Sequence, residues 1–147
     1  MSVRGEGMFS HILLPLDLDE PSSWRKALPA ALSLTRNFSC RLTLYTVISN
    51  PDAAEAAEWS AIGYREFVSV TEARLSNLAA EIEDAPGVST RVGRGSVYRS
   101  IVEDARVMGA DLIVMSAHRP EMKDYLLGAH AARVVRHAHC SVFIVRE

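Results

Sequence analysis

The residues of this chain that are best placed to do chemistry lie between Met115 and His137. An apolar strand pattern, Leu112–Met115, ends there, a polar loop follows, and an amphipathic helix pattern starts at Gly128. The first turn of that helix contains no Asp or Glu. Its backbone N–H groups and partial positive charge are therefore left without an acidic partner. A strand, a loop and a helix start with free donors are suited to binding a phosphate group.

The same segment has an ordinary structural interpretation. It can be a surface loop before a helix, with Gly128 packed against the sheet and Asp124 as an earlier N-cap. The segment contains no Gly-Lys-Ser/Thr of a Walker loop, and no Gly-rich turn follows the first strand pattern. The pattern alone therefore leaves a phosphate site and a plain surface loop as alternatives.

Composition describes an ordinary globular chain of 147 residues with a net charge of −2. This charge argues against nucleic acid and anionic membranes as partners, because both favour clustered Lys and Arg. No apolar run approaches the roughly 20 residues that span a bilayer, and Met1–Ser10 lacks the apolar core of a signal peptide. Cys40 and Cys140 belong to no paired motif, which fits a reducing compartment. We expect a cytoplasmic protein.

Apolar runs alternate along the chain with helical spacings. Strands are expected at His11–Asp17, Arg41–Ile48, Val88–Gly93, Asp111–Met115 and Ser141–Val145. Helices are expected at Trp24–Asn37, Tyr64–Asp84, between Ser96 and Gly109, and at Gly128–Ala138. Pro29 should kink the first helix or mark a restart. The alternation predicts one α/β domain from residue 9 to 147, with a five-stranded parallel sheet covered by helices on both faces and a flexible stretch before it at residues 1–8.

The long second helix pattern also predicts a buried face. The apolar residues expected to share that face are Phe67, Val70, Leu75, Leu78 and Ile82.

Ligands of open parallel sheets bind beyond the carboxyl ends of the strands, where the strand order reverses. The residues directly after the first, second and fourth strand patterns are therefore the ones to consider. They are Pro15, Leu16, Asp17, Val47, Ile48 and Met115 to Arg119.

Two motifs resemble a known family. Ala117-His-Arg-Pro120 and Leu126-Leu-Gly-Ala-His-Ala131 resemble the nucleotide-binding loop of the universal stress protein family. The match is closest to its bacterial F/G-type subgroup, which carries Ser-His-x-Pro and then Leu-Leu-Gly-Ser-Asn-Ala. Leu14-Pro-Leu-Asp17, Leu44-Tyr-Thr-Val47 and the segment from Val134 to Arg146 extend the resemblance over nearly the whole domain. It implies a flavodoxin-like, Rossmann-like (HUP-type) sandwich with strand order 3-2-1-4-5.

The resemblance also implies a ligand, ATP, with AMP or ADP as alternatives and Mg²⁺ as an optional companion. By position, Pro15, Leu16 and Asp17 would border the adenine and ribose, and Val47 would lie against the adenine. The residues implied at the ribose and phosphates are Met115, Ser116, His118 and Arg119, with Gly128, Ala129 and His130 presenting N–H groups to the phosphates.

This chain departs from the family pattern at three positions. Ser116 and Arg119 stand where the usual pattern has glycines, although the subgroup also lacks them. Ala129 replaces the Ser or Thr whose hydroxyl would contact a phosphate. Losing that hydrogen bond should cost about 0.5–1.5 kcal/mol, or up to roughly 3 kcal/mol with a charged acceptor. Arg119 and His130 could offset part of that loss.

Three functions stay open at this point. The first is a homodimeric universal stress protein that binds ATP, regulates a stress response with unknown protein clients, and pairs through the edge strand Ser141–Val145. The second is a nucleotide-free dimeric scaffold, consistent with Ala129, and the third is a slow ATPase. No set of catalytic residues is expected, because the pattern shows no Ser-His-Asp set and no paired carboxylates. No metal site is expected at His137-Ala-His139-Cys140, since residues two apart on a helix do not share a face.

Overall fold

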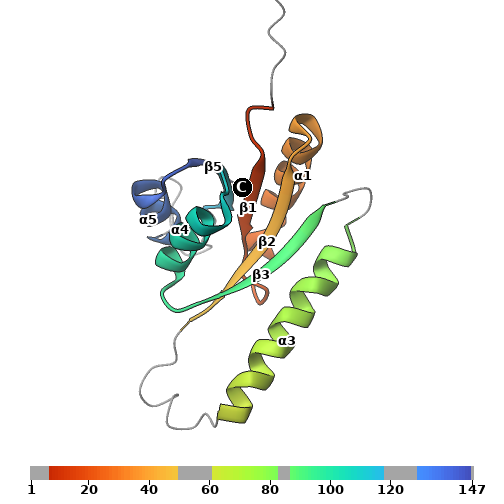
Figure 1. Cartoon of the computed structure of the whole chain (residues 1–147), viewed down its shortest axis with the longest axis vertical. Helices are drawn as coiled ribbons and strands as arrows, with labels where there is room; N and C mark the ends of the chain where they lie inside the picture. Colours follow the sequence, from red (N-terminus) through yellow and green to blue (C-terminus); the bar gives the residue numbers. More distant parts are fainter. Residues whose placement is uncertain (1–6, 50–60, 83–86, 118–128, 147) are drawn as a thin grey trace, which may run out of the picture.

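A single parallel sheet forms the centre of the molecule (Figure 1). The computed structural model describes residues 7–49, 61–82, 87–117 and 129–146. The strand order β3-β2-β1-β4-β5 confirms the predicted order and the parallel pairing. The strands are β1 (His11–Pro15), β2 (Arg41–Ile48), β3 (Val88–Arg94), β4 (Leu112–Ser116) and β5 (Ser141–Val145).

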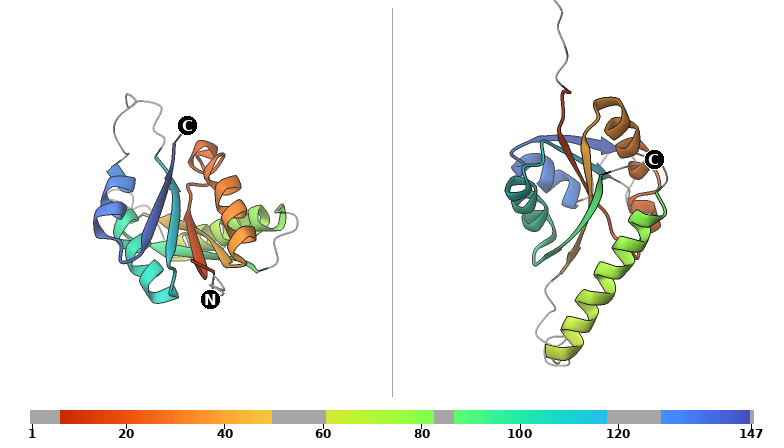
Figure 2. Two further views of the ribbon diagram at one scale, coloured as in Figure 1. Left: turned by 90° about the horizontal axis from the view of Figure 1, so that it is seen from above. Right: turned by 45° about the vertical axis from the view of Figure 1, so that its right-hand side comes forward.

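Helices cover both faces of this sheet, as the alternating pattern predicts (Figures 1 and 2). They are α1 (Ala27–Phe38), α3 (Ala61–Ala80), α4 (Val97–Met108) and α5 (Ala129–His137), with a short 3-10 helix at Pro21–Ser23. Helices α1 and α3 pack on one face, and α4 and α5 pack on the other. None of the helices in the described ranges is long and apolar enough to cross a membrane.

Strand β1 shows why the sheet is buried on both sides. All five of its residues are buried. Ile12 and Leu14 belong to the core beneath α1 and α3, and Leu13 to the core beneath α4 and α5. Because successive strand residues point to opposite faces, a continuous apolar run fills both cores at once.

Some element boundaries differ from the predictions. Helix α1 begins at Ala27 rather than Trp24, after the separate 3-10 helix. Pro29 is therefore in its first turn, where a missing backbone N–H costs no intrahelical hydrogen bond. A separate helix start close to Pro29, one of the two outcomes expected of this proline, is therefore found. Strand β1 ends at Pro15, which leaves Leu16 and Asp17 in the loop that follows.

The predicted buried face of α3 is partly wrong. Phe67 and Val70 are 43% and 57% exposed, whereas Val68, Thr71 and Leu75 are buried. The buried residues lie at spacings of three and four, as one helical face requires. The prediction considered only the positions of apolar residues. In the structure, the face of α3 that contacts β2 and β3 is the buried one, and this face includes a threonine.

Candidate functional site

A cavity of about 630 Å³ lies at the carboxyl ends of β1, β2 and β4. Strands β1 and β4 are neighbours in the sheet, and the chain leaves β1 toward β2 on the other side. The cavity therefore occupies the point where the strand order reverses, which is the usual ligand position in such sheets. The residues that line it are Pro15, Leu16, Asp17, Asp19, Glu20, Ser22, Ser23, Tyr45, Thr46, Val47, Ser49, Val97, Ile101, Met115, Ser116, Ala117, His130 and Ala131.

Most of the site residues expected from the sequence meet at this cavity. Those among its lining are Pro15, Leu16, Asp17, Val47, Met115, Ser116 and His130. Ala129 is the first residue of α5 and is exposed, without lining the cavity. His118, Arg119 and Gly128 lie outside the described residues.

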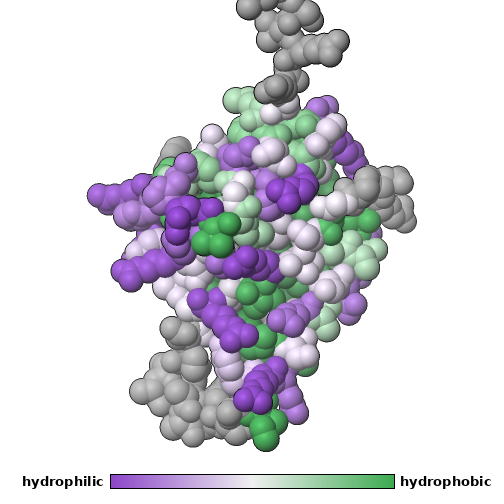
Figure 3. Space-filling view, in the orientation of Figure 1, coloured by the Kyte–Doolittle hydropathy of each residue, from purple (hydrophilic) through white to green (hydrophobic). Residues whose placement is uncertain are grey.

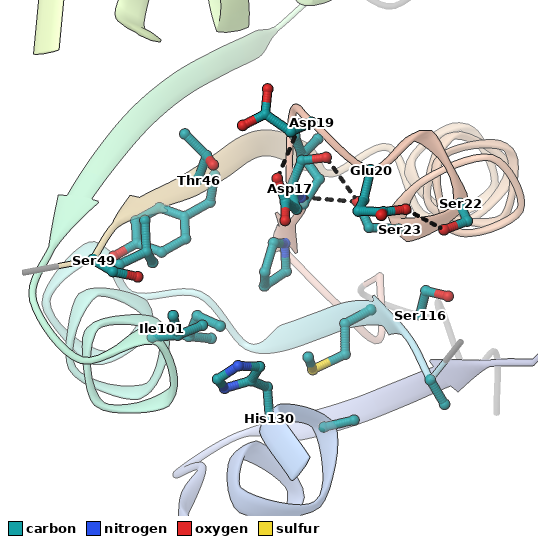
Figure 4. A pocket seen from close by; sticks show the side chains of 18 residues that line it. Asp17, Asp19, Glu20, Ser22, Ser23, Thr46, Ser49, Ile101, Ser116 and His130 are labelled. Atoms are coloured by element: carbon teal, nitrogen blue, oxygen red, sulfur yellow. Dashed lines mark hydrogen bonds between the residues drawn. The ribbon is translucent and has the colours of Figure 1, made fainter. Parts of the chain in front are cut away.

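The loop after β1 holds Asp17 in one orientation. The Asp17 amide donates to the Ser23 hydroxyl (2.8 Å), and that hydroxyl donates to the Asp17 carbonyl (3.1 Å). The Asp19 amide donates to Oδ1 of the Asp17 carboxylate (2.9 Å). Among the described residues no donor reaches Oδ2, so that oxygen can accept a hydrogen bond from a ligand. The dashed lines in Figure 4 mark these contacts.

This loop contributes an acidic wall that sequence reasoning missed in part. Asp17 was the one acid placed near the site, yet Asp19 and Glu20 also line the cavity, together with Ser22 and Ser23. Helix α3 supports the loop, because Arg74 donates to the Leu18 carbonyl (3.3 Å) and pairs with Asp19 (3.0 Å). The run Asp19-Glu-Pro-Ser-Ser23 directly after a buried strand is the signal that could have indicated this wall.

Apolar side chains form the floor between the strands and α4. Tyr45, Val97, Ile101, Met115 and Ala131 are its members. The Tyr45 side chain is fully buried, and its hydroxyl donates to the Asp104 carboxylate of α4. Burial, followed by the hydrogen bond to Asp104, raises the pKa of Tyr45 well above its ordinary value. Tyr45 is therefore neutral at physiological pH and gives the floor no charge.

The opposite wall comes from the start of α5. The labelled side chain of His130 lies across the cavity from Asp17 (Figure 4). The first turn of α5 has no acidic residue, as the sequence predicts, so no carboxylate of that turn offsets the partial positive charge of the helix start. The cavity thus has an acidic wall that can accept from hydroxyl or amino groups, an apolar floor, and a helix start that favours an anion.

The described residues give no sign of a metal centre. Within the described ranges, no three His, Cys, Asp or Glu side chains are placed to hold a metal ion together.

The sequence matches a known protein family over nearly its whole length. Residues 8–146 match the model of the universal stress protein family. The chain is 28% identical over 144 residues to universal stress protein G of Shigella flexneri, which covers 95% of this chain and 100% of that protein. It is also 28% identical over 148 residues to universal stress protein MJ0531 of Methanocaldococcus jannaschii, with 98% and 86% covered.

Solved structures share the fold. The hypothetical protein MJ0577 superposes with a TM-score of 0.79 at 22% identity, over 95% of this chain and 97% of that one. A universal stress protein in complex with cAMP gives 0.61 at 23% identity, over 94% and 97%. A universal stress protein family protein from Arabidopsis thaliana with AMP bound gives 0.61 at 18% identity, over 94% and 92%.

Proposed function

This chain belongs to the universal stress protein family, and from that premise we propose that its cavity binds an adenine nucleotide, ATP in particular. The observation that carries the proposal is the meeting of residues from β1, β2, β4 and α5 around one cavity at the strand-order reversal. Relatives of the same fold were solved with cAMP and with AMP, so a ligand of this class suits the fold.

The different chemistry of the cavity walls predicts the orientation of the bound nucleotide. The adenine lies on the apolar floor at Met115 and beside Val47, which also lines the cavity. Oδ2 of Asp17 accepts a hydrogen bond from a ribose hydroxyl or the adenine amine. The phosphates extend toward the start of α5, where backbone N–H groups and His130 meet them. Ala129 supplies an N–H group but no hydroxyl, so the phosphates have one donor fewer than in the usual family pattern. Mg²⁺ would bind together with ATP, coordinated by the phosphates.

Asp17→Asn tests this arrangement. An Asn side chain keeps an oxygen for the Asp19 amide, so the loop should keep its shape, but its NH₂ group replaces the free acceptor Oδ2. Losing one charged hydrogen bond should cost about 1.5–3 kcal/mol, which is roughly 10- to 150-fold in affinity. Titration calorimetry with Mg-ATP and with AMP measures the change. Ser33→Ala, on the exposed side of α1, is the matched control and should change neither affinity.

The proposal fails if the wild-type protein binds neither Mg-ATP nor AMP more tightly than millimolar. It also fails if Asp17→Asn binds both nucleotides as tightly as the wild type does. Mass spectrometry of ligand retained after purification would identify the base and the number of phosphates.

We also propose that the protein acts as a cytoplasmic homodimer that pairs through β5 and couples nucleotide occupancy to partners in a stress response. Strand β5 is at the edge of the sheet, and none of its five residues is fully buried. Phe143 is 46% exposed. An exposed edge strand with an aromatic side chain offers backbone and apolar surface to its own copy in an antiparallel, isologous pairing.

A further inference from the structure

A group of cationic side chains surrounds Tyr98 where α4 and α5 pack against each other. The Arg133 guanidinium lies 5.2 Å from the centroid of the Tyr98 ring, and the Arg99 guanidinium lies 5.8 Å from it. Nε of Arg99 donates to the Tyr98 hydroxyl (3.1 Å), and the His137 ring lies 5.6 Å from the same tyrosine ring. Figure 3 shows hydrophilic side chains projecting from the surface over these two helices.

These arginines have no acidic partner in the described part of the chain. Of the ion pairs found there, Arg74 pairs with Asp19, Arg91 with Asp104 and Arg106 with Glu103. Two guanidinium groups thus lie within about 6 Å of the centroid of one ring, and no carboxylate among the described residues pairs with either of them. Cation–π contacts at a partly exposed ring contribute only about 0.5–1 kcal/mol each, so the two cations stay available to an anion.

The backbone adds more positive charge at the same place. Arg99 is in the first turn of α4, which contains no acidic residue, and the Ser96 side chain makes no capping hydrogen bond there. A cation in the first turn of a helix is disfavoured by the helix dipole. Consistent with a cationic setting, the hydrogen bond from Arg99, with the charges of Arg99 and Arg133 acting in the same direction, lowers the pKa of Tyr98.

The cluster adjoins the cavity. Val97 and His130 line it, and Tyr98 is the next residue along α4 after Val97. Arg133 follows His130 by three residues on α5, which is about 4.5 Å along the helix axis. We propose that Arg99 and Arg133 form a phosphate-binding subsite beyond the mouth of the cavity. A phosphate there would accept hydrogen bonds from two guanidinium groups, which suit its oxygens, and would offset their positive charge.

The phosphate can come from two sources, the distal phosphates of a bound nucleotide or a separate phosphate ion. The nucleotide source rests on the proposed function, and the separate ion does not. The test variant is Arg99→Gln/Arg133→Gln. The control is Arg36→Gln, in which the same type of substitution removes one positive charge elsewhere. Arg36 is exposed on α1, on the other face of the sheet. Because both arginines are exposed, low ionic strength keeps their electrostatic contribution measurable.

Titration calorimetry with Mg-ATP, AMP, pyrophosphate and inorganic phosphate gives the readout. If the nucleotide is the source, the double variant loses about tenfold in ATP affinity, AMP affinity stays within twofold, and pyrophosphate binding falls at least tenfold. If the source is a separate ion, binding of phosphate and pyrophosphate falls at least tenfold while both nucleotides are unaffected. In either case Arg36→Gln matches the wild type, and the Tm of the double variant is no lower than that of the wild type.

The subsite is refuted if wild type and double variant bind all four ligands equally, or if Arg36→Gln loses as much as the double variant. It is also refuted if the wild type binds neither phosphate nor pyrophosphate and its ATP affinity is unaffected by the double substitution. A wild type that binds pyrophosphate through these arginines but binds no nucleotide would contradict the proposed function and leave the subsite standing. The two proposals therefore fail separately.

Discussion

Gly93 is expected to be intolerant of any side chain, because Tyr45 fills the space beside it. Gly93 is on β3, and a Cβ built there would lie 1.9 Å from the Tyr45 hydroxyl oxygen, 2.6 Å from Cζ and 3.1 Å from Oδ2 of Asp104. Two of these three contacts are shorter than any real Cβ makes. In Gly93→Ala the tyrosine ring, which is fully buried, must move.

The cost of Gly93→Ala has two parts. Overpacking a filled core typically costs about 1–3 kcal/mol. Moving the Tyr45 hydroxyl away from Asp104 loses a hydrogen bond to a charged acceptor, worth about 1.5–3 kcal/mol. Arg91 still pairs with Asp104 at 3.3 Å, so that carboxylate is not left without a partner. Together we expect a loss of about 3–5 kcal/mol, a large part of the roughly 5–15 kcal/mol that stabilises a domain.

Urea unfolding followed by circular dichroism measures this loss. With a slope of about 2 kcal/mol/M, the midpoint should fall by about 1.5–2.5 M. Gly109→Ala is the control, since Gly109 has φ +70 but no atom within 4 Å of its built Cβ. It should cost only about 1 kcal/mol, from the backbone conformation alone. Tyr45→Leu in the Gly93→Ala background should recover stability relative to the sum of the single changes, since the two sites are in contact. The packing argument is refuted if Gly93→Ala costs no more than Gly109→Ala, or if the two changes are additive.

Two further predictions concern pH and assembly. His11 is 4% exposed, its Nε2 lies 2.7 Å from Thr43 Oγ1, and burial, followed by the charge of Arg41, lowers its pKa. The folded protein therefore resists protonation, and part of its free energy of unfolding should be lost as the pH falls below the unfolded value of about 6.5 toward the folded pKa. Urea titrations at pH 7 and 5.5 should show a smaller loss for His11→Gln than for the wild type or the exposed control His139→Gln, and equal losses would contradict the reasoning. Phe143→Lys should convert the dimer to a monomer, as measured by light scattering, because a lysine on an edge strand opposes strand pairing. The control Val107→Lys, at a residue of α4 that is 60% exposed, should stay dimeric. A Phe143→Lys protein that remains dimeric would exclude pairing through β5.

Strand β1 and the start of α5 show what the sequence determined by itself. The apolar run from His11 to Pro15 is buried on both faces, which only a sheet covered by two helical layers allows. Hydrophobic periodicity and helix-ending residues, such as Gly109 with φ +70 at the end of α4, are local features of the sequence. They could therefore be predicted without knowing which elements pack against each other. Because parallel strands end at one edge, the strand pattern by itself nominated Asp17, Val47 and Met115 as neighbours, and all three line the cavity.

Contacts between elements distant in sequence were decided only by the tertiary structure. The loop after β1 turns so that Asp19 and Glu20 face the cavity, and its path depends on Arg74, which is 55 residues away from Asp19 in the chain. The face of α3 that is buried depends on β2 and β3 rather than on the number of its apolar residues. Tyr45 meets Gly93 because β2 and β3 pair with each other. Tyr98 meets Arg133 because α4 and α5 pack against each other on the same face of the sheet. A sequence pattern encodes which residues avoid water, whereas the partner of each one is set by shape and distance after the layers have come together.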